Sequence, residues 1–147
     1  MKNKVSELIG KELDYAVAIC RGFEGIDEDQ WLMRDGIADM PLHAYTPSSD
    51  WSQAGPIIES NNITIIRCND EYLTDSKGYC TNKRIPNWFA ETSKYIGHNI
   101  NESYEGEYME PSFIIEADGF YGSTALIAAM RSFVALKLGD EIEIPTL

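Results

Sequence analysis

The sequence lacks any apolar run of the roughly 20 residues that a membrane-spanning helix requires. Its first residues, MKNKVSELIG, also lack the apolar stretch of a signal peptide. Only three cysteines are present, Cys20, Cys68 and Cys80, and none of them forms a CxxC pair. We therefore expect a protein of the cytoplasm, in the host cell, with reduced thiols and no membrane contact.

Basic residues are scarce: 12 against 24 acidic ones, for a net charge of −12. Such a chain repels phosphate backbones, so we expect no direct binding to nucleic acid. No lysine or arginine occurs between Lys94 and Arg131. The acidic residues of this interval are Glu102, Glu105, Glu107, Glu110, Glu116 and Asp118. They form either a solvated surface or a surface that imitates nucleic-acid phosphates in front of a basic partner.

Motifs for catalysis and for metal binding are missing as well. The two histidines, His43 and His98, have no soft ligand beside them, so no metal site is expected. There is no GxSxG elbow, P-loop or dinucleotide-binding fingerprint. Cys80 lies in a polar segment without a distinctive neighbour. We expect a protein that is not an enzyme and uses no cofactor.

The periodicity of apolar residues predicts two main helices. One runs from Lys11 to the stop signal Arg21-Gly22, and the other leads from Ser123 to Gly139. Pro56 is predicted to begin a short helix. The apolar runs 63–66, 88–90 and 113–115 predict strands, and the polar segment 69–86 predicts a long loop.

These elements predict an α+β fold. A small antiparallel sheet of about three to four strands would pack against the two main helices. The length of 147 residues, with 44% apolar content, is that of one globular domain, residues 1–147.

The segment 45–59, YTPSSDWSQAGPIIE, combines aromatic and short polar residues, which is typical of a recognition loop. It predicts a ligand site with flat surfaces for a planar group and with polar groups for sugar hydroxyls or base edges. Arginines elsewhere would meet phosphate. The predicted ligand-binding residues are Tyr45, Ser48, Ser49, Asp50, Trp51, Gln53, Arg67 and Arg131. The alternative is that Trp51 fills the core while Asp50 and the serines cap a turn.

Three separated segments together resemble the NinX-like family of phage and prophage proteins, a domain of unknown function. They are VSELIGKELDYAVA, YTPSSDWSQAGPIIE with the following ITI, and STALIAAMRSFVALKLGDEI. The resemblance implies a phage accessory protein and brings no catalytic residues. Residues 68–116 match the family poorly, so a function housed there belongs to this protein in particular.

Two functions follow from these observations. The first is a non-enzymatic sponge that sequesters a small nucleotide-derived immune signal of the host. The second is an acidic inhibitor, or DNA mimic, that blocks a host defence protein. A homo-oligomer is also expected, because closed symmetric assemblies are common.

Overall fold

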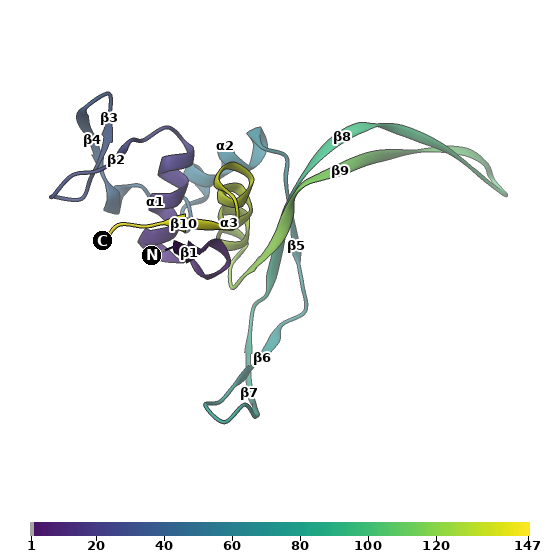
Figure 1. Ribbon diagram of the computed structural model, residues 1–147. Helices are drawn as coiled ribbons and strands as arrows, with labels where there is room; N and C mark the ends of the chain where they lie inside the picture. Colours follow the sequence, from purple (N-terminus) through teal and green to yellow (C-terminus); the bar gives the residue numbers. More distant parts are fainter. Residues whose placement is uncertain (1) are drawn as a thin grey trace.

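A computed structural model describes residues 2–147, except for the side chains of residues 85, 95 and 115–118. Strands occupy more of these residues than helices do, and they form four separate antiparallel sheets (Figure 1). The predicted α+β fold, with one small sheet against two main helices, is therefore wrong. Most of the strands were missed because they are exposed on both faces, so their sequences do not alternate between apolar and polar residues.

The α-helices are α1 (Gly10–Cys20), α2 (Trp51–Ser60) and α3 (Ala125–Leu138), with 3-10 turns η1 (Val5–Glu7) and η2 (Leu42–Ala44). The strands are β1 (Lys2–Lys4), β2 (Gly25–Ile26), β3 (Trp31–Arg34), β4 (Ile37–Pro41), β5 (Ile63–Arg67), β6 (Glu71–Thr74), β7 (Cys80–Ile85), β8 (Trp88–Ser103), β9 (Gly106–Gly122) and β10 (Glu141–Glu143). None of the helices within the described residues is long and apolar enough to cross a membrane.

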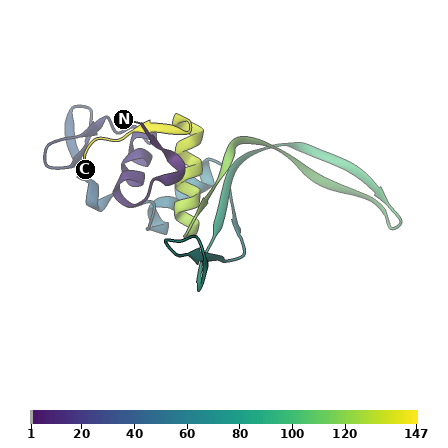
Figure 2. The same ribbon diagram turned by 60° about the horizontal axis from the view of Figure 1, so that its bottom comes forward.

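Helix α3 is the centre of the molecule and lies between α1 and the sheet of β5, β8 and β9 (Figures 1 and 2). It is buried on most sides, which explains why its sequence is apolar almost throughout. The hydroxyl of Thr124 accepts a hydrogen bond from the Ile127 N–H and caps its first turn. Gly139, with φ of 87°, ends the helix, as predicted.

The other two helices begin at different residues from those expected. Helix α1 begins at Gly10, one residue before the predicted start, and buries Leu13 and Val17 against α3. Helix α2 begins at Trp51, so Pro56 lies inside it and does not begin it. Asp50 provides the earlier start, because its carboxylate accepts the Ser52 N–H at 2.9 Å.

Strands β2, β3 and β4 form a small meander that none of the predictions from the sequence covers. Asp35 and Gly36 join β3 to β4, and both have positive φ, as a two-residue hairpin turn requires. Of the residues of this sheet, Leu32 is fully buried in a second apolar cluster with Phe23 and Leu42.

The predicted strand at 63–66 is confirmed as β5, whereas the predicted loop at 69–86 is wrong. That segment is the hairpin of β6 and β7, in which the Asp75 carboxylate accepts backbone N–H groups of Lys77 and Tyr79. The sequence of this hairpin resembles that of a loop, because β6 is exposed along its whole length and the turn is polar.

The predicted strands at 88–90 and 113–115 are parts of two much longer ones, β8 and β9. These pair with each other from Trp88 and Gly122 at the body to Ser103 and Gly106 at the tip. They project away from the helices as an arm, shown in green in Figures 1 and 2. We call residues 93–115 the arm. Glu102, Glu105, Glu107 and Glu110 lie on it, whereas the side chains of Glu116 and Asp118 lie outside the described residues.

Candidate functional site

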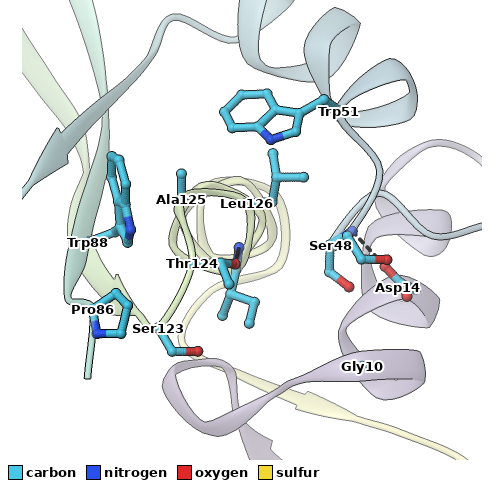
Figure 3. A pocket seen from close by; sticks show the side chains of 12 residues that line it. Gly10, Asp14, Ser48, Trp51, Pro86, Trp88, Ser123, Thr124, Ala125 and Leu126 are labelled. Carbon is cyan, nitrogen blue, oxygen red and sulfur yellow. Dashed lines mark hydrogen bonds between the residues drawn. The ribbon is translucent and has the colours of Figure 1, made fainter. Parts of the chain in front are cut away.

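The candidate site is a cavity of about 640 Å³ at the N-terminal ends of all three α-helices. Gly10, Trp51 and Ala125 are the first residues of α1, α2 and α3, and all three line it. Figure 3 shows the cavity around the first turn of α3. Three elements distant in sequence therefore meet at one place, and the short segments before α2 and α3 add further lining residues.

Two tryptophans lie on different sides of the first turn of α3 (Figure 3). Trp51 is 58% exposed and does not fill the core, which answers the question left open by the sequence. Trp88, at the start of β8, is partly buried against the core, and the Arg67 guanidinium lies 5.3 Å from its ring centroid. Trp88 is thus held in place, while Trp51 offers its face to solvent.

Asp14 is the one ionisable residue among the described residues that line the cavity. It lies on α1, is only 5% exposed, and accepts the Ser48 backbone N–H at 2.8 Å. Burial raises the pKa of this carboxyl, and the hydrogen bonds from Ser48 oppose that rise. The α1 side of the cavity wall therefore contains a strong hydrogen-bond acceptor that is largely shielded from water.

The opposite wall has the other polarity. Ser123 and Thr124 precede α3, and the amides of its first turn carry the positive end of the helix dipole. The chain before this turn passes close to α3 and requires a glycine at position 122, because a Cβ there would lie 2.6 Å from the Ala128 nitrogen. A ligand in this cavity would meet an acceptor on the α1 side and partial positive charge on the α3 side.

A second hollow of about 390 Å³ adjoins the cavity, since Pro86 and Ser123 line both. Arg131 lines this second hollow. Its Nε donates to the Leu8 carbonyl at 2.9 Å and its Nη1 to the Tyr121 carbonyl at 2.7 Å. Partial burial lowers the pKa of the guanidinium, yet an arginine stays charged at any physiological pH.

Comparison with known proteins concerns the part of the chain that builds the walls from α1, α2 and the start of β8. The family model described as Bacteriophage P22, NinX matches residues 4–92. The chain belongs to this family. No curated protein matches it. The resemblance seen in separate segments of the sequence is thereby confirmed for the first two of them.

In this NinX family member the matched residues contain Asp14, the Ser48–Trp51 segment and Trp88, and end at Thr92, where the arm begins. The walls from α1, α2 and β8 therefore lie in the matched residues, whereas the first turn of α3 lies outside them. The poor match expected for residues 68–116 is wrong for 68–92, and the arm lies outside the matched residues. Membership is consistent with an accessory role in a phage and specifies no ligand.

Three of the predicted site residues, Ser48, Ser49 and Trp51, line the cavity together. Tyr45 does not. Its ring packs edge-to-face on Phe23 with centroids 5.6 Å apart, and burial raises the pKa of its hydroxyl to about 12. Tyr45 touches both apolar clusters, so its place is structural.

Asp50 and Gln53 act on the backbone around α2. Asp50 is its N-cap, and the hydrogen bonds from Ser52 lower the pKa of the carboxyl. The Gln53 side chain accepts the Thr46 N–H at 2.9 Å and donates to the Ala44 carbonyl at 3.1 Å. Both residues shape the loop that presents Trp51, and neither lines the cavity.

The two predicted arginines lie in different places. Arg131 lines the adjoining hollow described above. Arg67 pairs with Asp70, donates to the Cys68 carbonyl at 2.6 Å and lies against Trp88, so its contribution to the cavity is indirect.

Sequence reasoning missed Asp14 and Trp88. Asp14 had a visible signal, because a charged residue interrupts the apolar stretch of α1 between Leu13 and Tyr15. Trp88 had none, since it reads as an ordinary strand residue.

Metal ligands and reactive thiols are the remaining groups that could carry chemistry. Among the described residues no cluster of three histidine, cysteine or acidic side chains could hold a metal ion. All three cysteines are free, and burial raises the pKa of the Cys20 thiol to about 12. That thiol stays protonated at neutral pH and is a poor nucleophile.

Proposed function

We propose that this phage protein binds a small nucleotide-like molecule in the cavity and does not transform it. The observation that carries the proposal is the arrangement of Trp51 and Trp88 on two sides of a cavity that also contains a buried carboxylate, Asp14. Aromatic faces with a few fixed polar groups are typical of sites for planar ligands. A volume of about 640 Å³ lies within the usual range of such pockets.

The planar part of the ligand would rest against the indole rings. Stacking of a nucleobase on an aromatic side chain is worth about 1–3 kcal/mol and tolerates any base, because each base has an aromatic face. The Asp14 carboxylate would accept an N–H of the base. The hydroxyls of Ser48 and Ser49 would take up the remaining edge groups or a sugar hydroxyl.

A phosphate would extend toward the adjoining hollow. Arg131 lines that hollow, and the first turn of α3 adds partial positive charge between the two. Arg67 is less suited to this role, since Asp70 already neutralises it. Of the two arginines named from the sequence, we therefore propose Arg131 as the phosphate contact.

Binding without catalysis is proposed because the lining of the cavity itself offers one carboxylate, Asp14, and no second acid–base group beside it among the described residues. Glu71 and Arg131 line the adjoining hollow and not the cavity. The sponge function predicted from the sequence is the specific form of this proposal. In that form the ligand is a nucleotide-derived immune signal of the host, and capture lowers its free concentration.

The test begins with protein purified from phage-infected cells that carry a nucleotide-signalling defence. Heat denaturation should release a nucleotide-like species at about one molecule per site, identified by mass spectrometry. Trp51→Ala should lose this species, because the variant lacks the indole on which the planar group would stack. The variant should still fold, because this indole is exposed and not part of the core. Trp31→Ala is the matched control, since Trp31 is also partly exposed but lies on β3, outside the cavity.

Direct titration separates the parts of the site. Adenosine, AMP and a cyclic dinucleotide serve as probes, and quenching of indole fluorescence reports occupancy. We expect Asp14→Asn to weaken all three probes and Arg131→Lys to weaken only those with phosphate. Full retention of ligand by Trp51→Ala would contradict the proposal, as would equal losses in Trp51→Ala and Trp31→Ala.

A further inference from the structure

The arm is a two-stranded ribbon, and within residues 2–147 no third strand pairs with it. Strand β5 accompanies β8 only as far as the pair Ile63 and Thr92, whereas β8 and β9 remain paired out to Ser103 and Gly106. Figures 1 and 2 both show this ribbon leaving the body. A two-stranded ribbon is marginally stable in water and carries unpaired backbone groups along its edges. Contact with another surface would stabilise it.

One face of the arm is apolar. Directly paired residues lie on the same face, so the register places Ile100 beside Met109. Pro111 and Phe113 follow Met109 at alternate positions of β9 and share that face. Ile100 is 68% exposed and Met109 64%. His98 is paired with Pro111 and lies on this face as well. An exposed strip made mainly of apolar residues marks a site of interaction.

The same face becomes acidic toward the tip. Glu102 lies directly opposite Glu107, and like charges in this position destabilise a strand pair. Glu105 lies in the connecting turn between the strands. No lysine or arginine follows Lys94 until Arg131, so the sequence offers the arm no cation of its own near these residues. A lysine or arginine from outside would relieve the repulsion between the two carboxylates.

We propose that the arm docks on a protein surface in which lysine or arginine side chains surround an apolar centre. Ile100 and Met109 would enter the apolar centre, while Glu102 and Glu107 would each meet a cation. The proposal is independent of the cavity. It assigns the acidic-surface function considered from the sequence to a defined face of the molecule.

Charge repulsion disfavours the two simplest competitors. Two arms placed face to face would bring four glutamates together in a dimer whose chains each carry a net charge of −12. Duplex nucleic acid would meet the same repulsion from its phosphates. A basic protein surface is the occupant that complements both the apolar strip and the charge.

The probe is a fluorescein-labelled amphipathic peptide of leucine and lysine, whose helical apolar stripe is flanked by lysines. The matched peptide has glutamate in place of each lysine. Fluorescence anisotropy measures binding of each peptide to the full chain at low and high salt. We expect only the lysine peptide to bind, with affinity that falls steeply as salt rises.

Two triple variants locate the binding surface. Glu102→Gln with Glu105→Gln and Glu107→Gln removes the negative charge of the tip, and Glu28→Gln with Asp29→Asn and Glu59→Gln removes the same charge from exposed positions of the body. We expect the arm variant to lose roughly tenfold or more in affinity and the body variant to lose about twofold, since only rim charges far from the contact change. Ile100→Ser with Met109→Ser should lose a similar factor at every salt concentration.

Equal losses in the two triple variants would overturn the proposal, because net charge alone would then explain binding. Retention of full affinity by the arm variant would overturn it as well. Self-association in sedimentation velocity that disappears in Ile100→Ser with Met109→Ser would assign the arm to a second copy of the chain instead. Glu107→Gln alone keeps the test valid if the triple variant unfolds, since it removes the repulsion and one cation contact together.

Discussion

The body and the arm are made of similar residue types and use them in opposite ways. In the body Met130, Phe133 and Val134 of α3 are buried, and the cavity opens at the N-terminal ends of the helices. In the arm Ile100, Met109 and their neighbours lie in solvent. The family pattern ends where the body gives way to the arm. The comparison shows that apolar content alone does not report a core: an apolar residue stabilises the fold only where other elements cover it.

The largest expected effect is on the stability of the body. Phe133→Ala should lower the free energy of unfolding by about 3–5 kcal/mol, because it leaves a cavity beneath α3. Ile100→Ala on the arm should change it by less than about 0.5 kcal/mol. Urea unfolding followed by circular dichroism measures both. Losses of similar size would show that the arm packs against the body in solution.

A smaller effect is expected where the arm returns to the body. Gly122→Ala would place a Cβ 2.6 Å from the Ala128 nitrogen and about 3.0 Å from Ile127, so the start of α3 must shift. We expect a loss of about 1–3 kcal/mol. Gly55→Ala is the control, since a Cβ there meets nothing within 4 Å apart from its chain neighbours. The gain in helix propensity, up to about 1 kcal/mol, is opposed by crowding against the ring of Pro56, so we expect little net change. Matching unfolding curves for the two variants would contradict the close packing at Gly122.

Asp14 should contribute a pH dependence of modest size. Its pKa is raised by burial in the folded state, so the folded state binds the proton more tightly than the unfolded state does. Stability should therefore decrease as pH rises from the unfolded value of 3.8 through the folded pKa, and then remain level. Asp14→Asn keeps an acceptor for the Ser48 N–H and should lack this decrease. Unfolding of both proteins across acidic and neutral pH measures it, and parallel curves would exclude the effect.

The smallest effect is expected for Asp50→Asn, because asparagine caps a helix as well as aspartate does. Thermal unfolding at neutral pH and ligand retention should both be unchanged, whereas Asp50→Ala should lower the melting temperature. The Asp50 pKa is lowered by hydrogen bonds, so its contribution is present above 3.8 and is lost as pH falls through the folded pKa. The asparagine variant should lack that loss at acidic pH. Loss of ligand in Asp50→Asn would return this residue to the binding site.

The sequence predicted well those elements whose apolar pattern reflects burial. Helix α3 and strand β5 were found because their partly or fully buried positions recur with the period of the element. The arm was not found, because Glu102, Glu107 and their neighbours follow no such pattern on an exposed ribbon. The Asp35-Gly36 turn was a usable signal for a hairpin and was overlooked.

Of the residues that line the cavity, the sequence predicted only those that lie in one short segment. Ser48, Ser49 and Trp51 lie in one short segment, so their proximity follows from the sequence. Asp14 and Trp88 come from other elements, and only the packing of α1 and β8 around α3 brings them to the same cavity. Asp50 and Gln53 were predicted to bind the ligand, yet their hydrogen bonds hold the backbone around the start of α2.

The pairing of β1 with β10 places Lys2 opposite Glu143 and Lys4 opposite Glu141, so the two ends of the chain lie side by side. In Figures 1 and 2 both ends lie on the side of the body away from the arm. A surface support, a reporter domain or an affinity handle attached at either end would therefore hold the molecule by its base. The arm would then point away from the attachment point and remain accessible to a binding partner in solution.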